Sequence, residues 1–517
     1  MLWFYDFKRV QVKLKLIKSS FAIEKRYPSL FSGIIRVVSR IHETAGGMLI
    51  MGVILSINEF LHGIAWGPFT IVLLLGLGVY LTARLRGIQF SCLWASMKTV
   101  FGGLGGKKRK RAQKGSVTPF QALATALAGC VGTGNIAGVA SAIVIGGTGA
   151  VFWMWASAFV GMAVKYAEVF LSVRYRCKND AGEMTGGPMH YMMRGLGKKG
   201  RGLACLFAGL GAIAAFGSGN MVQSNALTDA VTRTVMTYTA LFDNELTCKL
   251  LVGAVVAVVS AIVVLGGVKR IGSVAGVLVP VMSLAYTLTA VGVICVNYYN
   301  IPDALGGIIK NAFGFMPMLG GVTGFTLTRA FRTGVARGIF SNEAGLGSAP
   351  MAHACADTKD PVRQGLYGIA EVFIDTIVMC TITALALLCS GVKIPFGQAD
   401  ISGTELMSGA FSTLLSEKAS NLLIMACMVL FGFSTILCWA LYGTRCAEFL
   451  FGERARRPYQ FIYIAVVIVG AVMRLDLAWS VAETVNGFMS IPNLIAVLLL
   501  SPTVIRETRA RDPRDMV

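Results

Sequence analysis

Residues 126–142 read ALAGCVGTGNIAGVASA, and this stretch decides the fold because glycines interrupt a segment that is otherwise apolar and helix-forming. Each glycine inside a helix costs roughly 1 kcal/mol and exposes backbone. Gly132 and Gly134 lie two residues apart in the middle of the run. If the segment crosses a bilayer, other groups must satisfy the amides and carbonyls that the break releases. We therefore expect a functional site at this break.

The composition is that of an integral membrane protein. The 517 residues are 55% hydrophobic and only 14% charged, with a mean hydropathy of +0.67, whereas soluble domains carry roughly 25% charged residues. The net charge of +21 arises mostly from Lys and Arg between apolar runs. That pattern indicates positive-inside loops in a lipid bilayer and no nucleic-acid partner. The twelve cysteines form no CxxC motif and are typical of small core residues.

Eleven apolar runs have the length of about 20 residues that a membrane span needs. They fall near residues 67–83, 118–145, 150–173, 203–232, 248–267, 273–297, 323–350, 365–390, 420–444, 459–473 and 478–502. The second and seventh runs are interrupted by glycine and polar residues. Most basic residues lie in loops on one side, which predicts that this side and the C-terminal tail, residues 503–517, are cytoplasmic in a multi-pass protein of the cell (inner) membrane.

The basic N-terminal extension, residues 1–57, conflicts with this topology, because an odd number of spans places the N-terminus outside. Three interpretations remain: a cytoplasmic arm with residues 47–57 contributing an extra span, an amphipathic segment on the membrane surface, or a start codon assigned too early. We favour the last, since Met48 and Met51 stand just before an apolar segment. A chain that begins at Met48 is then expected to insert like the full chain.

The opening stretch has a counterpart later in the chain. LAGCVGTGNIAGVASA, from Leu127, and VARGIFSNEAGLGSAP, from Val335, are both apolar, then polar and kinked, then rich in small residues. The apolar span that follows each carries an acidic residue, Glu168 or Asp375. Residues 118–297 hold five spans and residues 323–502 hold five, so the second set enters from the opposite side. This predicts an all-α inverted repeat, preceded by one extra helix and a basic loop in residues 58–117.

In transporters with inverted repeats, matching broken helices meet near the midplane. The N-termini of the half-helices present amides to anions, and unwound carbonyls coordinate cations. Here the amides around Thr133, Gly134 and Asn135 can hold a carboxylate, and the carbonyls of Ala128 and Val131 can face a cation. The alternative is that the glycines only mark close helix packing. A dinucleotide-binding turn is excluded, because it requires a βαβ unit.

Two other function classes have less support. A membrane-embedded enzyme would need catalytic pairs within the spans, but the sequence has no HExxH motif, and His42, His62, His190 and His353 are scattered. A passive channel would not need an inverted repeat with two broken helices. Accumulation of labelled substrate against its gradient would separate a secondary transporter from a channel.

Four separated motifs then resemble one family. They are GTGNIAGVASAIVIGGTGAVFWMWASAFVGMAVKYAE from Gly132, FGSGNMVQSNAL from Phe216, GVARGIFSNEAGLGSAPMAHA from Gly334 and FIDTIVMCTITAL from Phe373. Together they resemble the alanine/glycine:cation symporter family, from about Asn58 to Glu507. The resemblance implies a leucine-transporter-like five-plus-five fold and sodium-coupled uptake of alanine or glycine, with glutamine, D-alanine and proton coupling left open. Thr148 departs from the family pattern, where a proline is usual.

The resemblance and the helical spacing together nominate a substrate site. It comprises the bend with carboxylate-binding amides, a face at positions i, i+4 and i+7 of the fourth span, three carbonyls that accept from the ammonium group, and one aromatic wall. The nominated residues are, in that order, Gly132, Thr133, Gly134 and Asn135; Phe216, Asn220 and Gln223; Phe340, Ser341 and Asn342; and Trp439. Glu343 is expected to clamp the second bend.

The same resemblance implies a sodium site. Ser434 and Thr435 stand side by side, and in this fold paired hydroxyls there complete a site with carbonyls of the first broken helix, here Ala128 and Val131. Oxygen ligands suit a hard cation. The alternative is that both hydroxyls bond back to their own helix.

Overall fold

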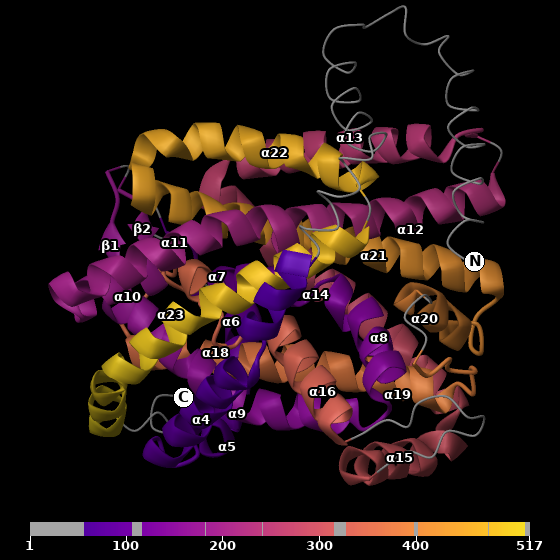
Figure 1. Cartoon of the computed structure of the whole chain (residues 1–517), viewed down its shortest axis with the longest axis horizontal. Coiled ribbons are helices and arrows are strands. Elements are labelled where there is room, and N and C mark those ends of the chain that lie inside the picture. Colours follow the sequence, from indigo (N-terminus) through magenta and orange to yellow (C-terminus); the bar gives the residue numbers. More distant parts are fainter. Residues whose placement is uncertain are drawn as a thin grey trace, which may run out of the picture. The chain divides into compact units, whose positions relative to one another are not determined.

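The computed structural model describes residues 56–105, 116–180, 182–239, 241–314, 327–397, 402–473 and 475–511. Nearly all of the regular structure in these ranges is helical (Figure 1). Within the described ranges, eight helices are long and apolar enough to span a membrane: Ser56–Arg84, Ala150–Arg174, Gly197–Tyr238, Glu245–Val264, Gly267–Val296, Pro361–Cys389, Glu417–Phe451 and Trp479–Ala510. This identifies an integral multi-pass membrane protein. The predicted extension, residues 1–57, lies almost entirely outside the described residues.

Nine of the eleven predicted spans are helical over nearly all of their described residues, and the second and seventh are helices interrupted by non-helical residues 131–132 and 343–349. Their elements are α4 (Pro68–Arg84), α7 (Pro119–Cys130) with η1 (Thr133–Asn135) and α8 (Ala137–Gly146), α9 (Ala150–Arg174), α11 (Arg201–Phe216) with η3 (Gly217–Met221) and α12 (Val222–Tyr238), α13 (Glu245–Val264), α14 (Gly267–Val296), α16 (Leu327–Asn342) with α17 (Pro350–His353), α18 (Pro361–Val372) with η5 (Phe373–Cys380) and α19 (Thr381–Cys389), α21 (Glu417–Phe451), α22 (Arg456–Val472) and α23 (Leu475–Ala510). The three predicted spans that are not among these eight are the two broken helices and α22, whose 17 residues are short for a span.

The first broken helix has a well-defined start and a steric reason for its break. Thr118 caps α7 through its hydroxyl, which accepts from the amide of Gln121 at 3.2 Å, and a proline follows at the first helical position. The helix ends at Cys130, and Gly132 is extended, with φ −127° and ψ −161°. A Cβ on Gly132 would lie 2.8 Å from Thr435 Oγ1. Glycine is therefore required for the close approach of α21.

The second broken helix unwinds after Asn342. Glu343 has φ +53°, which is unusual for a residue with a side chain, and Gly345 and Gly347 have φ +85° and +80°. The amide of Gly345 donates to Glu168 Oε2 on α9 at 3.3 Å. Glu168 on α9 thus accepts from a backbone amide that the unwound segment leaves without a helical partner.

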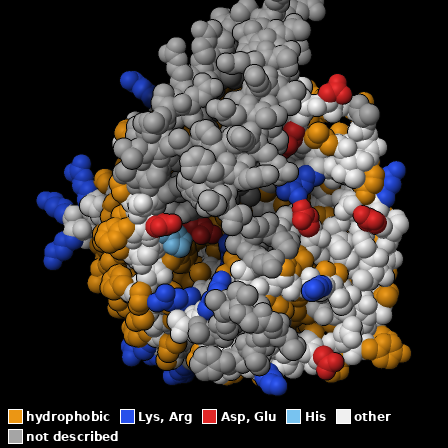
Figure 2. All heavy atoms as spheres, turned by 45° about the vertical axis from the view of Figure 1, so that its right-hand side comes forward, with side chains coloured by type: hydrophobic (Ala, Val, Ile, Leu, Met, Phe, Trp, Pro, Cys, Tyr) orange, Lys and Arg blue, Asp and Glu red, His pale blue; other side chains and the backbone are white. Residues whose placement is uncertain are grey.

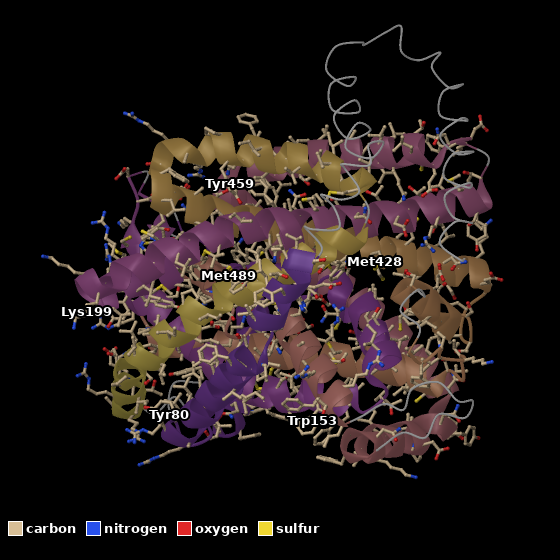
Figure 3. The ribbon with its side chains drawn as sticks, viewed as in Figure 1. Tyr80, Trp153, Lys199, Met428, Tyr459 and Met489 are labelled. Atoms are coloured by element: carbon tan, nitrogen blue, oxygen red, sulfur yellow. The ribbon has the colours of Figure 1, made fainter. Side chains whose placement is uncertain are left out.

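The helices pack in an arrangement that places both breaks inside. α16 and α18 pack on α9, α7 packs on α14 and α21, and α11 and α12 pack on α21. α13 and α22 lie side by side along the top of Figure 1, where Figure 3 labels Tyr459 on α22. The Tyr459 hydroxyl donates to the carbonyl of Ala212 on α11 at 2.7 Å. Large apolar side chains on α13 and α14 remain exposed, such as Val255, Val258, Ile262, Val277 and Leu284, as expected for faces toward lipid.

Several connecting elements have no counterpart among the sequence predictions. They are α5 (Ile88–Ser91), α6 (Leu93–Gly105), the hairpin of β1 (Cys177–Lys178) and β2 (Met184–Thr185), α10 (Pro188–Gly195), η2 (Gly197–Gly200), η4 (Tyr298–Asn300), α15 (Ile301–Phe313), α20 (Gly403–Phe411) and η6 (Glu453–Ala455). In the hairpin, Cys177 pairs with Thr185 and Lys178 with Met184. These segments are shorter than a membrane span, so the span pattern does not reveal them. Lys199, in η2, lies at the periphery of the molecule on the left of Figure 3.

The hairpin is fastened to the helix bundle by charge. Glu183 lies within 2.8 Å of Arg445 on α21 and 3.1 Å of Arg456 on α22. Burial raises the pKa of Glu183, but the two arginines outweigh it and hold that pKa below its usual range. Beside it, burial and then the charges of Arg194 and Arg445 lower the pKa of His190 to about 4. His190 is therefore neutral at pH 7 in the folded protein.

The His190 shift predicts acid sensitivity. Because the folded pKa is depressed, the unfolded chain binds the extra proton more readily, so stability is fully present above pH 6.5 and is lost as the pH falls toward 4. The loss amounts to roughly 3 kcal/mol. Thermal unfolding of the detergent-purified protein should show a midpoint that drops across this window, and His190→Gln should flatten the drop. An equally steep drop in the variant would contradict the assignment.

Candidate substrate and cation site

A small cavity lies where the two broken helices meet. Its volume is about 20 Å³, which is room for one or two water molecules. The lining residues are Gly129, Cys130, Gly132, Gly134, Ser218, Gln223, Phe340, Ser341, Glu343, Thr435, Trp439 and Asn486. They come from α7 and its break, the η3–α12 segment, α16 and its break, α21 and α23. Segments that are far apart in the sequence therefore enclose one site.

Seven of the residues nominated from the sequence line this cavity. They are Gly132, Gly134, Gln223, Phe340, Ser341, Thr435 and Trp439. Six others lie just behind it and hold the lining in place: Ala128, Val131, Thr133, Asn135, Asn342 and Ser434. Phe216 and Asn220 are not brought to the cavity.

The first break is closed by its own side chain. Asn135 Oδ1 accepts from the amide of Gly132 at 3.0 Å, and Thr133 Oγ1 donates to Gln223 Oε1 at 2.9 Å. Thr133 and Gly134 open a short helix, whose first amides have no acceptor within the helix. A Cβ added to Gly134 meets no atom within 4 Å. The bend thus presents amides beside open space, as an anion site at a helix N-terminus requires.

A buried carboxylate joins the two breaks. Asp375, in η5, accepts from Asn135 Nδ2 at 2.7 Å and from the hydroxyls of Ser341 and Thr376 at 2.8 Å each. Thr376 Oγ1 in turn accepts from Asn342 Nδ2 at 3.1 Å. One carboxylate therefore fixes Asn135 of the first break against Ser341 of the second.

A second carboxylate, Glu371, lies one turn earlier in the same span. Its carboxylate accepts hydrogen bonds from Lys165 Nζ of α9 and from Cys130 Sγ of α7, at 3.1 Å each. His353 Nε2 of α17 lies 2.9 Å from the same carboxylate. Lys165, Glu371 and His353 are fully buried. Glu371 ties the end of α7 to α17, so the two carboxylates hold the broken helices together on both sides of the cavity.

Trp439 is held rigidly at the cavity wall. Its Nε1 donates to Glu343 Oε1 at 3.1 Å, and Glu343 Oε2 accepts from the hydroxyl of Ser348. A Cβ on Gly219 would lie 2.1 Å from Trp439 Cβ. The indole therefore packs directly against Gly219. Its ring nitrogen is held by Glu343, whose backbone is in the left-handed region.

The paired hydroxyls lie against the first broken helix. Thr435 Oγ1 donates to the carbonyl of Ala128 at 3.0 Å, and Ser434 Oγ lies 3.5 Å from the same oxygen. Both hydroxyls also lie within hydrogen-bond distance of the Phe431 carbonyl, at 2.8 Å for Ser434 and 3.0 Å for Thr435. The two hydroxyls thus make both the predicted contact with α7 and the alternative contact with their own helix, α21. Val131 is buried beside them at the end of α7.

The predicted face of Phe216, Asn220 and Gln223 is wrong as a regular helical face. Residues Gly217–Met221 form a π-helical turn, which changes the side-chain register between Phe216 and Gln223. Phe216 packs on Tyr459 and Tyr463, with ring centroids 4.9 and 5.9 Å apart. Asn220 Nδ2 donates to the carbonyl of Tyr463 at 2.6 Å. Only Gln223 faces the break.

Sequence reasoning missed several residues at the site. Asp375 was noted only as a marker of the repeat and Glu371 not at all, although a carboxylate inside a membrane span is a functional candidate by default. Lys165 is a charged residue in a span and carried the same signal. Ser218 and Asn486, which line the cavity, have no comparable sequence signal.

Comparison with known proteins is informative at this point. The model of the sodium:alanine symporter family matches residues 51–512. The chain belongs to the sodium:alanine symporter family. It is therefore a membrane transporter of the symporter type and not an enzyme. The family expected from the sequence and the prediction that the protein is not an enzyme are both confirmed.

Two relatives and one solved structure show how far the similarity extends. The sodium/alanine symporter AgcS of Methanococcus maripaludis is 44% identical over 88% of this chain and 96% of its own length. The probable sodium/glutamine symporter GlnT of Bacillus subtilis is 38% identical over 87% of this chain and 89% of its own. The structure of MhsT with L-phenylalanine is 12% identical, with a TM-score of 0.53 over 77% of this chain and 99% of that one. This likeness supports a leucine-transporter-like membrane fold.

The Asp375 junction can be tested directly. Asp375→Ala removes the buried acceptor that Asn135, Ser341 and Thr376 share, so it should destabilise the protein by about 2–5 kcal/mol. The measurement is the unfolding midpoint of the purified protein in detergent. Asp303→Ala, which removes an exposed acid on α15, serves as the control. Equal midpoints for the two variants would show that the junction contributes little.

Proposed function

We propose that the protein is a secondary active transporter that couples sodium to the uptake of a small neutral amino acid, alanine or glycine, across the cell (inner) membrane by alternating access. The observation that carries this proposal is the meeting of two broken helices around one small polar cavity. Unwound helices at membrane depth are tolerated where they line such a cavity. Membership in the sodium:alanine symporter family supports the same activity.

The two ends of an amino acid fit the two breaks. The substrate carboxylate accepts from the amides of Thr133 and Gly134, where the partial positive end of a helix favours an anion. The ammonium group is held by the carbonyls of Phe340, Ser341 and Asn342, which end α16 and lack amide donors from a further helical turn. Thr133 and Asn342 thereby act through backbone while their side chains fix the breaks.

The aromatic wall favours small side chains. Trp439 is locked by Glu343 and Gly219, so it cannot retreat without breaking that hydrogen bond. The cavity of about 20 Å³ is smaller than any amino acid, so binding requires modest outward movement of Phe340 or the breaks. Alanine and glycine need the least movement. The name of GlnT shows that the family also includes a probable glutamine carrier.

Sodium is proposed to bind between α7 and α21. The ligands are the hydroxyls of Ser434 and Thr435 with the carbonyls of Ala128 and Val131. All four are neutral oxygens, which suit a hard monovalent cation. Thr435 and Ala128 are already in contact, so a cation that enters replaces one hydrogen bond by several oxygen contacts and bridges α7 and α21.

We further propose the five-plus-five inverted repeat, with residues 118–297 and 323–502 as its halves. The broken helices α7–α8 and α16–α17 stand at the start of each half. The acids Glu168 and Asp375 come in the next span of each half and both contact the second break. The basic side and the C-terminus are cytoplasmic in this arrangement, and α4 is the extra helix.

The decisive experiment uses protein reconstituted in vesicles. An inward sodium gradient should drive labelled alanine above its equilibrium concentration, and the accumulation should collapse without sodium. Equilibration without accumulation would favour a channel. Accumulation driven equally by a proton gradient in sodium-free buffer would assign the coupling to protons, and a competition panel with glycine, D-alanine and glutamine would rank the substrates.

The sodium site gives one mutational prediction. Ser434→Ala with Thr435→Ala deletes two oxygen ligands, so the sodium concentration for half-maximal uptake should rise at least about tenfold. Thr444→Ala, which removes a hydroxyl two turns later on α21 that bonds to its own helix, should leave it unchanged. An unaltered sodium dependence in a well-inserted double variant would remove both hydroxyls from the site.

The first break gives another. Gly134→Ala should weaken alanine binding at least about tenfold and Gly134→Leu should abolish it, because the added side chain enters the cavity. Gly138→Ala is the matched control: its Cβ also meets no atom within 4 Å, but Gly138 does not line the cavity. Direct binding to purified, folded protein is the measurement. If Gly134→Leu binds alanine within about threefold of the parent, about 0.65 kcal/mol, the bend is only a packing feature.

A further inference from the structure

A second, larger cavity lies on the other side of Phe340. Its volume is about 430 Å³, within the range of roughly 300–1,000 Å³ typical of small-molecule sites. Residues 62–71, α16 and α23 form its walls. Phe340 lines both this cavity and the small central one. We call it the outer cavity, because in the proposed orientation α16 enters the membrane on the side opposite the basic loops.

The outer cavity contains a fixed carboxylate. Glu483 on α23 lies 3.3 Å from Arg337 on α16 and 3.4 Å from His62, and its backbone carbonyl accepts from Trp66 Nε1 at 2.8 Å. Two separate segments, α16 and residues 62–66, therefore hold Glu483 in place. Figure 2 shows acidic, basic and histidine side chains close together among hydrophobic ones on this face.

The same cavity contains a cation with no acidic partner. Arg332, which lines the cavity, has no carboxylate within ion-pair distance among the described residues, whereas Arg337 is paired with Glu483. The two arginines that line the cavity outnumber its one carboxylate, Glu483. A guanidinium that is free to form two parallel hydrogen bonds is the preferred partner of a carboxylate.

The partition between the two cavities is a single aromatic side chain with its own anchor. The ring of Phe340 lies 5.8 Å from that of Trp479 on α23, and the guanidinium of Arg337 lies 5.6 Å from the same tryptophan ring. Glu483, Arg337 and Phe340 therefore fasten α16 to α23 around Trp479. Rotation of Phe340 would join the outer cavity to the central one.

We propose that the outer cavity is a second binding site for the same small zwitterion, with its carboxylate on Arg332, its ammonium group beside Glu483 and its small side chain against Phe340. This inference rests on the proposed function, because it takes the ligand to be the transported amino acid. A simple anion would use Arg332 alone and a simple cation Glu483 alone, whereas an α-amino acid satisfies both. The site receives substrate before Phe340 moves.

A cysteine reporter tests the outer cavity independently of the central one. Ala336→Cys places a thiol on the cavity wall, Gly134→Leu blocks the central site, and Cys205→Ser with Cys295→Ser removes the thiols exposed in the described part of the chain. The rate of reaction with a membrane-impermeant thiol reagent is measured with and without alanine. At ten times its Kd, alanine should slow labelling by about tenfold. No protection by alanine at any concentration would overturn the proposal.

Arg332→Gln in the same background should abolish the protection, and Lys310→Gln should retain it. Lys310 is an exposed cation on α15 that does not line the cavity. Protection that survives Arg332→Gln would overturn the assignment of the carboxylate partner.

Equilibrium dialysis of the parent provides a measurement that does not depend on the folding of Gly134→Leu. The parent should bind two alanine molecules per chain and Arg332→Gln one. A parent that binds one molecule, unaffected by Arg332→Gln, would overturn the second site while leaving the proposed function intact. A parent that binds no alanine would instead overturn the proposed function, and this inference with it.

Discussion

The structure depends on two buried carboxylates that stand one turn apart on a single span. Breaking a helix inside a membrane releases backbone groups that lipid cannot satisfy, and two broken helices double that cost. Asp375 holds Asn135 and Ser341, one from each break, and Glu371 holds Cys130 and faces His353. Because each carboxylate serves both broken helices, neither break can move without the other. The cavity keeps its shape for this reason.

The two carboxylates are stabilised in different ways. Lys165 neutralises Glu371 at 3.1 Å, whereas Asp375 is surrounded by hydroxyl and amide donors. A buried carboxylate with several hydrogen bonds is tolerated, and removal of one partner strands the rest. The site is thus built from buried polar groups that are individually costly and mutually dependent, so we expect the exchange of any one of them to destabilise the others.

Much of the fold could be predicted from the sequence, because span length and apolar runs are direct consequences of bilayer thickness. Nine of the eleven ranges are helical over nearly all of their described residues, the second and seventh are interrupted helices, and the glycine pair at Gly132 and Gly134 marked the first break. The substrate and sodium roles assigned to the nominated residues stay predictions. The side-chain register at Phe216 was beyond sequence reasoning, since a π-helical turn has no compositional signature. The partners of Asp375 also require the three-dimensional arrangement, because Asn135 lies 240 residues away.

The π-helical turn at Gly217–Met221 has an evolutionary consequence. Such a turn is equivalent to an α-helix that has gained one residue, and each added residue rotates the rest of an α-helix by about 100°. Deleting one residue there would restore a straight helix and swing Gln223 away from Thr133, its partner at 2.9 Å. Relatives that differ by a single-residue gap at this point would therefore present different chemistry to the first break, even if every other position were identical. The loss or gain of one residue at this turn would thus have the same effect on the first break as a substitution of Gln223.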